Sequence, residues 1–171
     1  MERWEIIPDF PNYLVSDEGF VRHEKGEQDL KCLTNNTGVV YVNLWQDGRR
    51  HGRSLARLVA LAFLAEPEYP HFDTPINLNG DGSDNRASNL MWRPRWFAVK
   101  YHQQFYSSPK GFRVPIVDLD SGERFPNSWE AATKFGLLDI DILKQTLTHN
   151  RVFPTNQLFE VEWRKTSYLI D

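Results

Sequence analysis

The order of hydrophobic and polar residues predicts two small hairpins in the first third of the chain. Short apolar runs at residues 13–15 and 20–22 are separated by a turn at residues 17–19. Residues 38–44, GVVYVNL, are rich in β-branched side chains, and the Asp47-Gly48 turn that follows leads into a further strand. Pairing of such strands would form a small antiparallel sheet.

A helix is predicted next, because apolar side chains recur there at helical spacing. The residues of this apolar face are Leu55, Leu58, Val59, Ala62 and Phe63. Ser54 precedes them as an N-cap, and Pro67 ends the helix. Residues 75–92 then predict two short strands around Gly80, followed by a short helix at residues 84–91. This outline is a ββα unit.

The last third of the chain predicts two helices joined by a tight turn. Ser128 caps the first helix, Gly136 makes the turn, and the second helix spans residues 139–148. A closing strand is predicted at residues 159–163. Two helices joined in this way indicate a helix-turn-helix module.

Residues 93–113 separate these parts, contain no acidic residue and alternate basic with aromatic side chains. Such a segment predicts a basic aromatic linker, in which cations neutralise phosphates while aromatic faces stack on bases. We therefore expect an α+β fold with a small N-terminal antiparallel sheet. Its three predicted parts are an N-terminal module with a ββα core at 1–92, the linker at 93–113, and a helix-turn-helix-like domain at 114–171.

Composition narrows the class of protein. The chain has 171 residues, 40% of them hydrophobic, a formal net charge of −3 and a pI near 6.0, which do not by themselves favour a nucleic-acid partner. The single cysteine, Cys32, excludes an internal disulfide and a four-cysteine zinc site. We see no signal sequence or membrane-spanning run, and we expect a cytoplasmic protein.

The segment PINLNGDGSDNRASNLMW, residues 75–92, carries the most specific motif. Its Gly-Asp-Gly turn, its Asn85-Arg86 pair and its Asn89-Leu90-x-Trp92 ending resemble the core of the HNH homing endonucleases of phages and introns. The resemblance runs through nearly the whole chain in the family's order, including a modular helix-turn-helix at the end. The other matching segments are residues 4–7, 13–21, 38–44, 57–63, 115–119 and 128–132, together with Gly122 and Ile142.

The resemblance implies a site whose catalytic positions are degenerate. In the family, a histidine on the first strand of the ββα unit activates a water molecule, and flanking acidic, amide or histidine side chains hold a divalent cation. These positions correspond here to Asn77 for the general base and to Ile76 and Ala98 for the metal ligands. Asparagine cannot take up a proton near neutral pH, and neither Ile nor Ala binds Mg²⁺. We therefore expect no catalytic residue, no metal and no cofactor.

The remaining motif residues are interpreted as structural. They are Gly80, Asn85, Arg86, Asn89 and Trp92. Amides in such a segment can tie a turn to its neighbouring strands by hydrogen bonds.

Basic residues predict contacts with double-stranded DNA in three places: the second hairpin with its helix, the linker, and the C-terminal domain. They are Arg49, Arg50, Arg53, Arg57, Arg93, Arg95, Lys100, Lys110, Arg113, Lys144 and Arg151. Acidic residues outnumber basic ones in the C-terminal part, and Asp139 and Asp141 begin its second helix. Because DNA phosphates repel carboxylates, this pattern indicates a helix-turn-helix whose DNA recognition is weakened or that serves another purpose.

Three hypotheses follow. The first is a catalytically inactive HNH-endonuclease-like phage protein that binds DNA by occupancy, or as an accessory to a DNA-handling complex. The second is a protein-binding component of a phage or host complex, such as a polymerase, ribosome or virion; the location would then be an infected host cell or a virion. The third is an active Mg²⁺-dependent nicking enzyme that uses displaced residues, namely His71, His102 or Asp81.

Overall fold

The computed structural model describes residues 1–107, 111, 113–148, 151, 153–155 and 157–161. The chain divides into two compact units, Met1–His102 and Gln103–Asp171. The predicted division into three parts at 92/93 and 113/114 stays a prediction. Within the described part of the chain, no helix is both long and apolar enough to cross a membrane.

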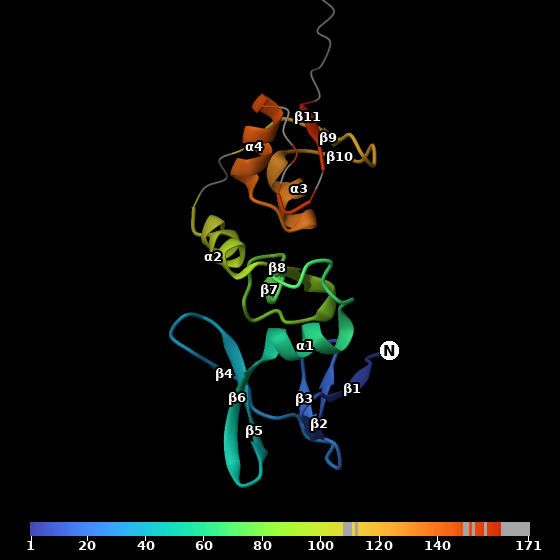
Figure 1. Cartoon of the computed structure of the whole chain (residues 1–171), viewed down its shortest axis with the longest axis vertical. Coiled ribbons are helices and arrows are strands. Elements are labelled where there is room, and N and C mark those ends of the chain that lie inside the picture. Colours follow the sequence, from blue (N-terminus) through green and yellow to red (C-terminus); the bar gives the residue numbers. More distant parts are fainter. Residues whose placement is uncertain (108–110, 112, 149–150, 152, 156, 162–171) are drawn as a thin grey trace, which may run out of the picture. The chain divides into compact units, whose positions relative to one another are not determined.

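Two three-stranded antiparallel sheets form the first half of the N-terminal unit (Figure 1). The strands of one sheet are β1 (Trp4–Ile7), β2 (Phe10–Ser16) and β3 (Val21–His23). The strands of the other are β4 (Leu33–Thr34), β5 (Val40–Gln46) and β6 (Arg49–Ser54). The two predicted hairpins are thus β2–β3 and β5–β6, and they belong to separate sheets because their strands pair only locally.

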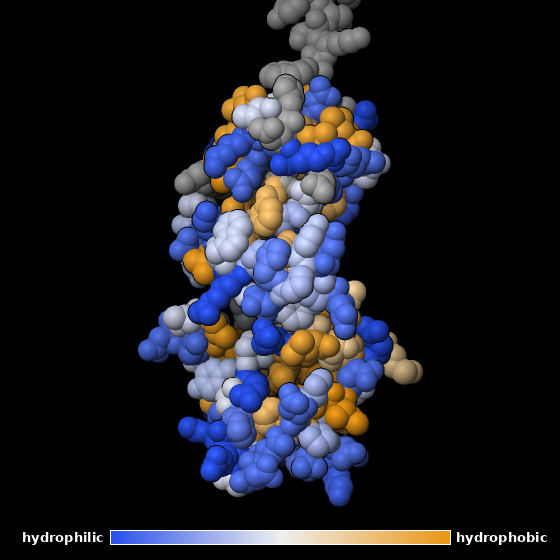
Figure 2. All heavy atoms as spheres, in the orientation of Figure 1, coloured by the Kyte–Doolittle hydropathy of each residue, from blue (hydrophilic) through white to orange (hydrophobic). Residues whose placement is uncertain are grey.

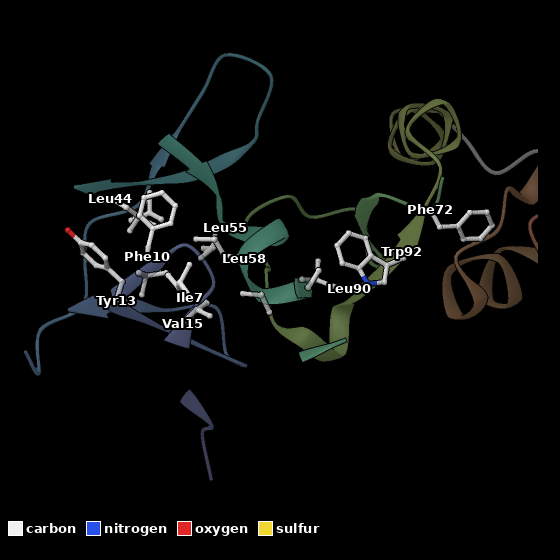
Figure 3. Packing of buried hydrophobic residues seen from close by; sticks show 14 residues of the cluster. Ile7, Phe10, Tyr13, Val15, Leu44, Leu55, Leu58, Phe72, Leu90 and Trp92 are labelled. Carbon is white, nitrogen blue, oxygen red and sulfur yellow. The ribbon is translucent and has the colours of Figure 1, made fainter. Parts of the chain in front are cut away.

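Helix α1 (Leu55–Phe63) follows β6 directly and packs its apolar face on the strands. The Ser54 hydroxyl caps it by accepting a hydrogen bond from the backbone N–H of Arg57, at 3.4 Å. Figure 3 shows core side chains from β1, β2, β5 and α1 meeting in one cluster. Tyr13 joins the sheets, because its hydroxyl oxygen accepts a hydrogen bond from the backbone N–H of Trp45 at 3.0 Å.

The ββα unit is built from different elements than the sequence predicts. Strand β7 (Thr74–Asn77) pairs antiparallel with β8 (Leu90–Arg93), and only a short 3₁₀ turn, η1 (Ala87–Asn89), precedes β8. The helix predicted at residues 84–91 is therefore wrong, because side chains there bond to nearby backbone groups instead of allowing a helix. The helix of the unit is α2 (Arg95–Gln104), which lies in the segment predicted as linker.

The C-terminal unit has a three-stranded antiparallel sheet and two helices. The strands are β9 (Ile116–Asp118), β10 (Arg124–Phe125) and β11 (Phe159–Val161). Helices α3 (Ser128–Phe135) and α4 (Asp139–Thr148) are joined by a turn at Gly136, whose φ of 60° favours glycine. The first cap is Asn127 rather than the predicted Ser128, which is buried. The predicted strand end at residues 162–163 lies outside the described residues.

Candidate functional site

The three positions predicted to be degenerate lie on β7 and α2 of the ββα unit and are buried. Ile76 and Asn77 are the last two residues of β7, and Ala98 lies in the first half of α2. Their exposed fractions are 0%, 5% and 4%. The two positions predicted to correspond to metal ligands are therefore filled by aliphatic side chains that belong to the hydrophobic interior.

Asn77 is held by hydrogen bonds on both its side chain and its backbone. Its side-chain amide donates to the carbonyl oxygen of Asp84 at 2.8 Å and to Asn85 Oδ1 at 3.3 Å. Its backbone N–H donates to Nε2 of His102 at 3.4 Å. The side chain predicted to stand in place of the general base is thus a buried donor that links β7 to the following loop.

The loop between β7 and β8 is closed by side-chain amides. The amide nitrogen of Asn89 donates to Asn79 Oδ1 at 2.9 Å and to the carbonyl oxygen of Asp84 at 2.8 Å. The Asn89 side-chain oxygen accepts from the backbone N–H of Asn79 at 3.1 Å. Asn85 donates to the carbonyl oxygens of Gly82 and Ser83. These bonds give the amides of the motif a structural role.

Charges in this loop are paired with each other. The guanidinium of Arg86 lies 2.7 Å from Asp84 Oδ2. Hydrogen bonding to Arg86 lowers the pKa of Asp84, and the same contact raises the pKa of Arg86. The Ser83 hydroxyl and backbone N–H lower the pKa of Asp81 by donating to its carboxylate. Both acids are therefore ionised near neutral pH.

The turn between β2 and β3 packs against this loop. The backbone N–H of Ala87 donates to the carbonyl oxygen of Asp17 at 2.8 Å. Gly19 has a φ of +88°, and a side chain there would place its Cβ 3.2 Å from the backbone carbon and oxygen of Asn85. The glycine of the N-terminal signature thus allows the hairpin to approach the motif loop closely.

Three ionisable side chains beside β7 are buried or half-buried, namely Arg93 at the end of β8 and Tyr101 and His102 of α2. Burial lowers the pKa of His102, lowers the pKa of Arg93 to about 10 and raises the pKa of Tyr101. The Tyr101 hydroxyl donates to the carbonyl oxygen of Leu78 at 2.7 Å. A lowered pKa keeps His102 neutral, and a neutral imidazole can accept the Asn77 N–H.

The displaced residues considered for metal binding are not brought together. His71 belongs to an aromatic cluster with Tyr69 and Phe72, whereas His102 contacts the backbone of Asn77. Among the residues that the structure describes, no group of three His, Cys, Asp or Glu side chains could hold a metal ion. The side chains of Ile76, Asn77 and Ala98 together provide one possible oxygen ligand, the Asn77 amide oxygen, whereas a hard cation requires several oxygen ligands.

The predicted arginine cluster of the second hairpin divides between two faces of its sheet. Arg50 lies directly across from Trp45, whereas Arg53 lies over the ring of Phe10, on the side that faces the core. The Arg57 guanidinium donates to the carbonyl oxygen of Asp73. Strongly hydrophilic residues gather on the N-terminal unit around the turn of the β5–β6 hairpin (Figure 2). Arg49 and Arg50 are exposed there.

The other residues predicted to contact DNA differ in their exposure and in their ion pairs. Arg95 and Lys100 of α2 and Arg113 are exposed, Arg93 is buried, and Lys110 lies outside the described residues. In the C-terminal unit, Lys144 pairs with Asp141 at 3.4 Å and Arg151 pairs with Asp120 at 3.3 Å.

Two features were missed from the sequence. Trp45 is 58% exposed on the outward face of β5, which the alternation with buried Val42 and Leu44 could have indicated. Asp139 was expected to repel DNA, yet it is buried and accepts hydrogen bonds from the Ser128 hydroxyl and the Gly111 backbone N–H. No local sequence signal marks Asp139 as buried, because the groups it binds are 11 and 28 residues away.

The β7–β8–α2 arrangement and its amide-closed loop define an HNH-like ββα core. Two curated relatives are uncharacterized HNH endonucleases of Acanthamoeba polyphaga mimivirus. One is 27% identical over 135 residues, which cover 79% of this chain and 40% of the relative. The other is 34% identical over 94 residues, which cover 53% of this chain and 23% of the relative. The chain thus spans less than half the length of either relative.

A solved structure shares the fold. The HNH homing endonuclease I-HmuI, known from a structure describing its DNA binding and cleavage, matches 95% of this chain and 99% of its own, with a TM-score of 0.52 and 20% identity. No protein-family profile matches the sequence. The predicted resemblance to the HNH homing endonuclease family and the predicted α+β fold class are confirmed.

Proposed function

We propose that this chain is a catalytically inactive HNH-endonuclease-like protein that binds double-stranded DNA and acts by occupying it, alone or as an accessory to a DNA-handling complex. The observation that carries the proposal is that Asn77, which stands in place of the general base, is buried and donates a hydrogen bond from its side-chain amide. Ile76 and Ala98 add to it, because they remove oxygen ligands from the two positions where a cation would bind.

DNA as the partner is supported by the fold and by exposed cations. The structural neighbour I-HmuI binds and cleaves DNA, and this chain aligns with nearly all of it. Arg49 and Arg50 on the second hairpin and Lys100 on α2 are exposed. Such side chains can neutralise phosphates even in a chain of negative net charge, because local charge governs phosphate contacts.

Binding is tested by fluorescence anisotropy with a labelled random-sequence duplex at several salt concentrations. We expect affinity that falls steeply between about 50 and about 200 mM NaCl, since each phosphate contact contributes about 0.9 to the salt slope. The double variant Arg49→Ala/Arg50→Ala should reduce the slope by about two. The matched control is Arg3→Ala, because that guanidinium is not among the predicted DNA contacts and is already paired with the Asp17 carboxylate. Absence of any binding at low salt would contradict the proposal.

A second candidate function is Mg²⁺-dependent nicking with a displaced base. The observation in its favour is the 3.4 Å contact between His102 Nε2 and the backbone nitrogen of Asn77, which places a neutral imidazole beside the degenerate position. Nicks that require Mg²⁺ or Mn²⁺ and that disappear in the His102→Ala variant would establish this function in place of the first.

A third candidate is a protein-binding component of a larger complex. Three basic side chains of the C-terminal unit, Lys134, Lys144 and Arg151, are paired with acids, which lowers the positive charge offered to phosphates. Copurification of a partner protein at high salt, together with no detectable affinity for DNA, would favour this function. Surface ion pairs are weak, at about 0–1 kcal/mol, so these side chains can still exchange their partners for phosphates.

A further inference from the structure

The loop between β7 and β8 contains the only Asn-Gly pair of the chain, Asn79-Gly80. Asparagine is a thermolabile residue. Its side chain reacts fastest when glycine follows, because no side chain then hinders attack by the next backbone nitrogen. Gly80 has a φ of 76°, a left-handed conformation that favours glycine, so the turn itself requires the residue that makes Asn79 reactive. Asn79 is exposed to water, which the reaction consumes.

The reaction at such a pair is an intramolecular substitution followed by hydrolysis. The backbone nitrogen of Gly80 loses its proton to solvent and forms a bond to Cγ of Asn79. The bond from Cγ to Nδ2 breaks, and the nitrogen leaves as ammonia with a proton from solvent. Water then opens the cyclic succinimide at either carbonyl carbon. The product at position 79 is aspartate, or isoaspartate in which the main chain runs through Cγ, and nothing is oxidised or reduced.

Both reacting groups of the pair are held by hydrogen bonds in the folded protein. The Gly80 N–H donates to the carbonyl oxygen of Asn77 at 2.9 Å, which engages the nitrogen that would attack. The side-chain nitrogen of Asn79 donates to Asp84 Oδ2 at 2.9 Å. Its side-chain oxygen accepts from Asn89 Nδ2 and from the backbone N–H two residues on, both at 2.9 Å. The amide is therefore fixed by neighbours and cannot turn toward Gly80 unless these bonds open.

We propose that Asn79 is a site of spontaneous deamidation, and that the hydrogen bonds of this loop hold back the reaction until the loop opens. The attacking group, the leaving group and water are all present at the site, so the reaction needs no enzyme or cofactor. The inference goes beyond the proposed function and does not depend on whether the chain binds DNA.

The product of the reaction disrupts the loop that delays it. Aspartate at position 79 has a carboxylate oxygen where Asn79 Nδ2 now lies, 2.9 Å from the carboxylate of Asp84. Two carboxylates at such a distance repel each other, and the donor to Asp84 is lost. Isoaspartate also lengthens the main chain of the turn. Because ammonia escapes, the change is one-way, and the modified loop is less stable than the original one.

The test measures deamidation at position 79 over time by peptide mass spectrometry. The natural chain is incubated at the same mildly alkaline pH either folded or unfolded in guanidinium chloride. We expect position 79 to react in the unfolded chain and to react more slowly in the folded chain by roughly 25-fold or more. This factor corresponds to at least two hydrogen bonds that must open, at about fivefold for each.

A variant that opens the loop should speed the reaction in the folded protein. Asn89→Ala removes two hydrogen bonds to Asn79 and should raise the rate by up to roughly 25-fold. Asp84→Ala removes the acceptor of Asn79 Nδ2 and should raise it by about fivefold. The matched control is Ser88→Ala, an exposed neighbour of Asn89, which should leave the rate unchanged. Circular dichroism verifies that each variant is folded.

The consequence for the loop is measured with Asn79→Asp, which supplies the product without the reaction. This variant should unfold at a lower urea concentration than the natural chain, because its carboxylate faces that of Asp84. Asn36→Asp is the control, because Asn36 is an exposed asparagine outside this loop. Equal stability of Asn79→Asp and the natural chain would contradict the disruption of the loop.

The kinetic outcomes decide the rest of the inference. No deamidation at position 79 in the unfolded chain would overturn the site itself. Equal rates in the folded and unfolded chain would overturn protection by the loop, and so would unchanged rates in both folded Asn89→Ala and folded Asp84→Ala. The comparison of the folded with the unfolded natural chain requires no variant, so it decides protection even where a substitution prevents folding. DNA binding is measured separately, so failure of this inference leaves the proposed function standing.

Discussion

The side-chain amide nitrogen of Asn77 lies 2.8 Å from the backbone carbonyl oxygen of Asp84, and this bond joins the end of β7 to the loop before β8. A general base must leave an acceptor nitrogen or oxygen free to take a proton from water. The amide nitrogen of Asn77 instead donates, and its exposed fraction of 5% leaves little access for water. Asn77, which is predicted to replace the family's general base, thus joins two parts of the backbone by hydrogen bonds.

Replacing Asn77 by alanine should destabilise the protein. The substitution removes two side-chain hydrogen bonds from a buried site, and each contributes about 1 kcal/mol to stability. We expect a loss of about 1–2 kcal/mol in the free energy of unfolding measured with urea. The control is Asn36→Ala, because Asn36 is exposed and such substitutions stay within about 0.5 kcal/mol. Equal stability of the two variants would show that these bonds contribute nothing.

The close approach of Gly19 to Asn85 makes a second prediction about the motif loop. Alanine at position 19 would be strained by a φ of +88° and would also press on the backbone of Asn85. Gly38 has a similar φ of +81°, but a Cβ there would meet nothing within 4 Å. Gly38→Ala should therefore cost about 1 kcal/mol from backbone strain alone, and Gly19→Ala should cost clearly more. The two unfolding curves measure the difference, and identical curves would exclude a structural role for the contact.

The lowered pKa of His102 predicts that stability falls on mild acidification. The unfolded chain takes up a proton near the ordinary histidine pKa of 6.5, whereas the folded protein resists protonation until a lower pH. The free energy of unfolding should therefore be largest above about pH 6.5 and should decrease as pH falls through that value, levelling off below the folded pKa.

Urea unfolding at about pH 5.5 and about pH 7.5 checks this behaviour. Asp81 and Asp84 have lowered pKa values and stay ionised across this window, so they do not contribute to the change. The His102→Gln variant should lose most of the pH dependence, whereas His71→Gln, on the exposed loop, should keep it. Unchanged pH dependence in His102→Gln would mean that another group is responsible.

Local patterns were sufficient for the hairpins and for α1, because alternating Val42 and Leu44 or helically spaced Leu55 and Val59 report burial directly. The motif loop was predicted as a helix, because its amides bond to backbone groups that spacing does not reveal. Helix α2 was hidden by its polar and basic residues, and only Phe97, Ala98 and Tyr101 are buried. Its place in the ββα unit depends on contacts with Asn77 and Leu78, which lie 25 and 23 residues from their partners in the chain.

At the candidate site, the sequence alone was sufficient to predict that Ile76, Asn77 and Ala98 supply neither a general base nor a set of metal ligands. The sequence could not show that these positions are buried, nor that the His102 ring lies beside Asn77. The sequence also could not show which charged side chains are exposed. Asp139 is turned inward by groups far away in the chain, and the arginines of β6 are divided by strand alternation between two faces.

The most direct test of catalytic inactivity is relaxation of supercoiled plasmid in Mg²⁺. The natural chain is compared with the triple variant Ile76→Asp/Asn77→His/Ala98→Asn, which supplies a base and two oxygen ligands on the same frame. The control is the same variant with Asn77→Ala instead of Asn77→His, and circular dichroism verifies that both are folded. We predict no nicked circles from the natural chain and Mg²⁺-dependent nicking from the triple variant alone. Nicking by the natural chain that is abolished by EDTA would contradict the proposal.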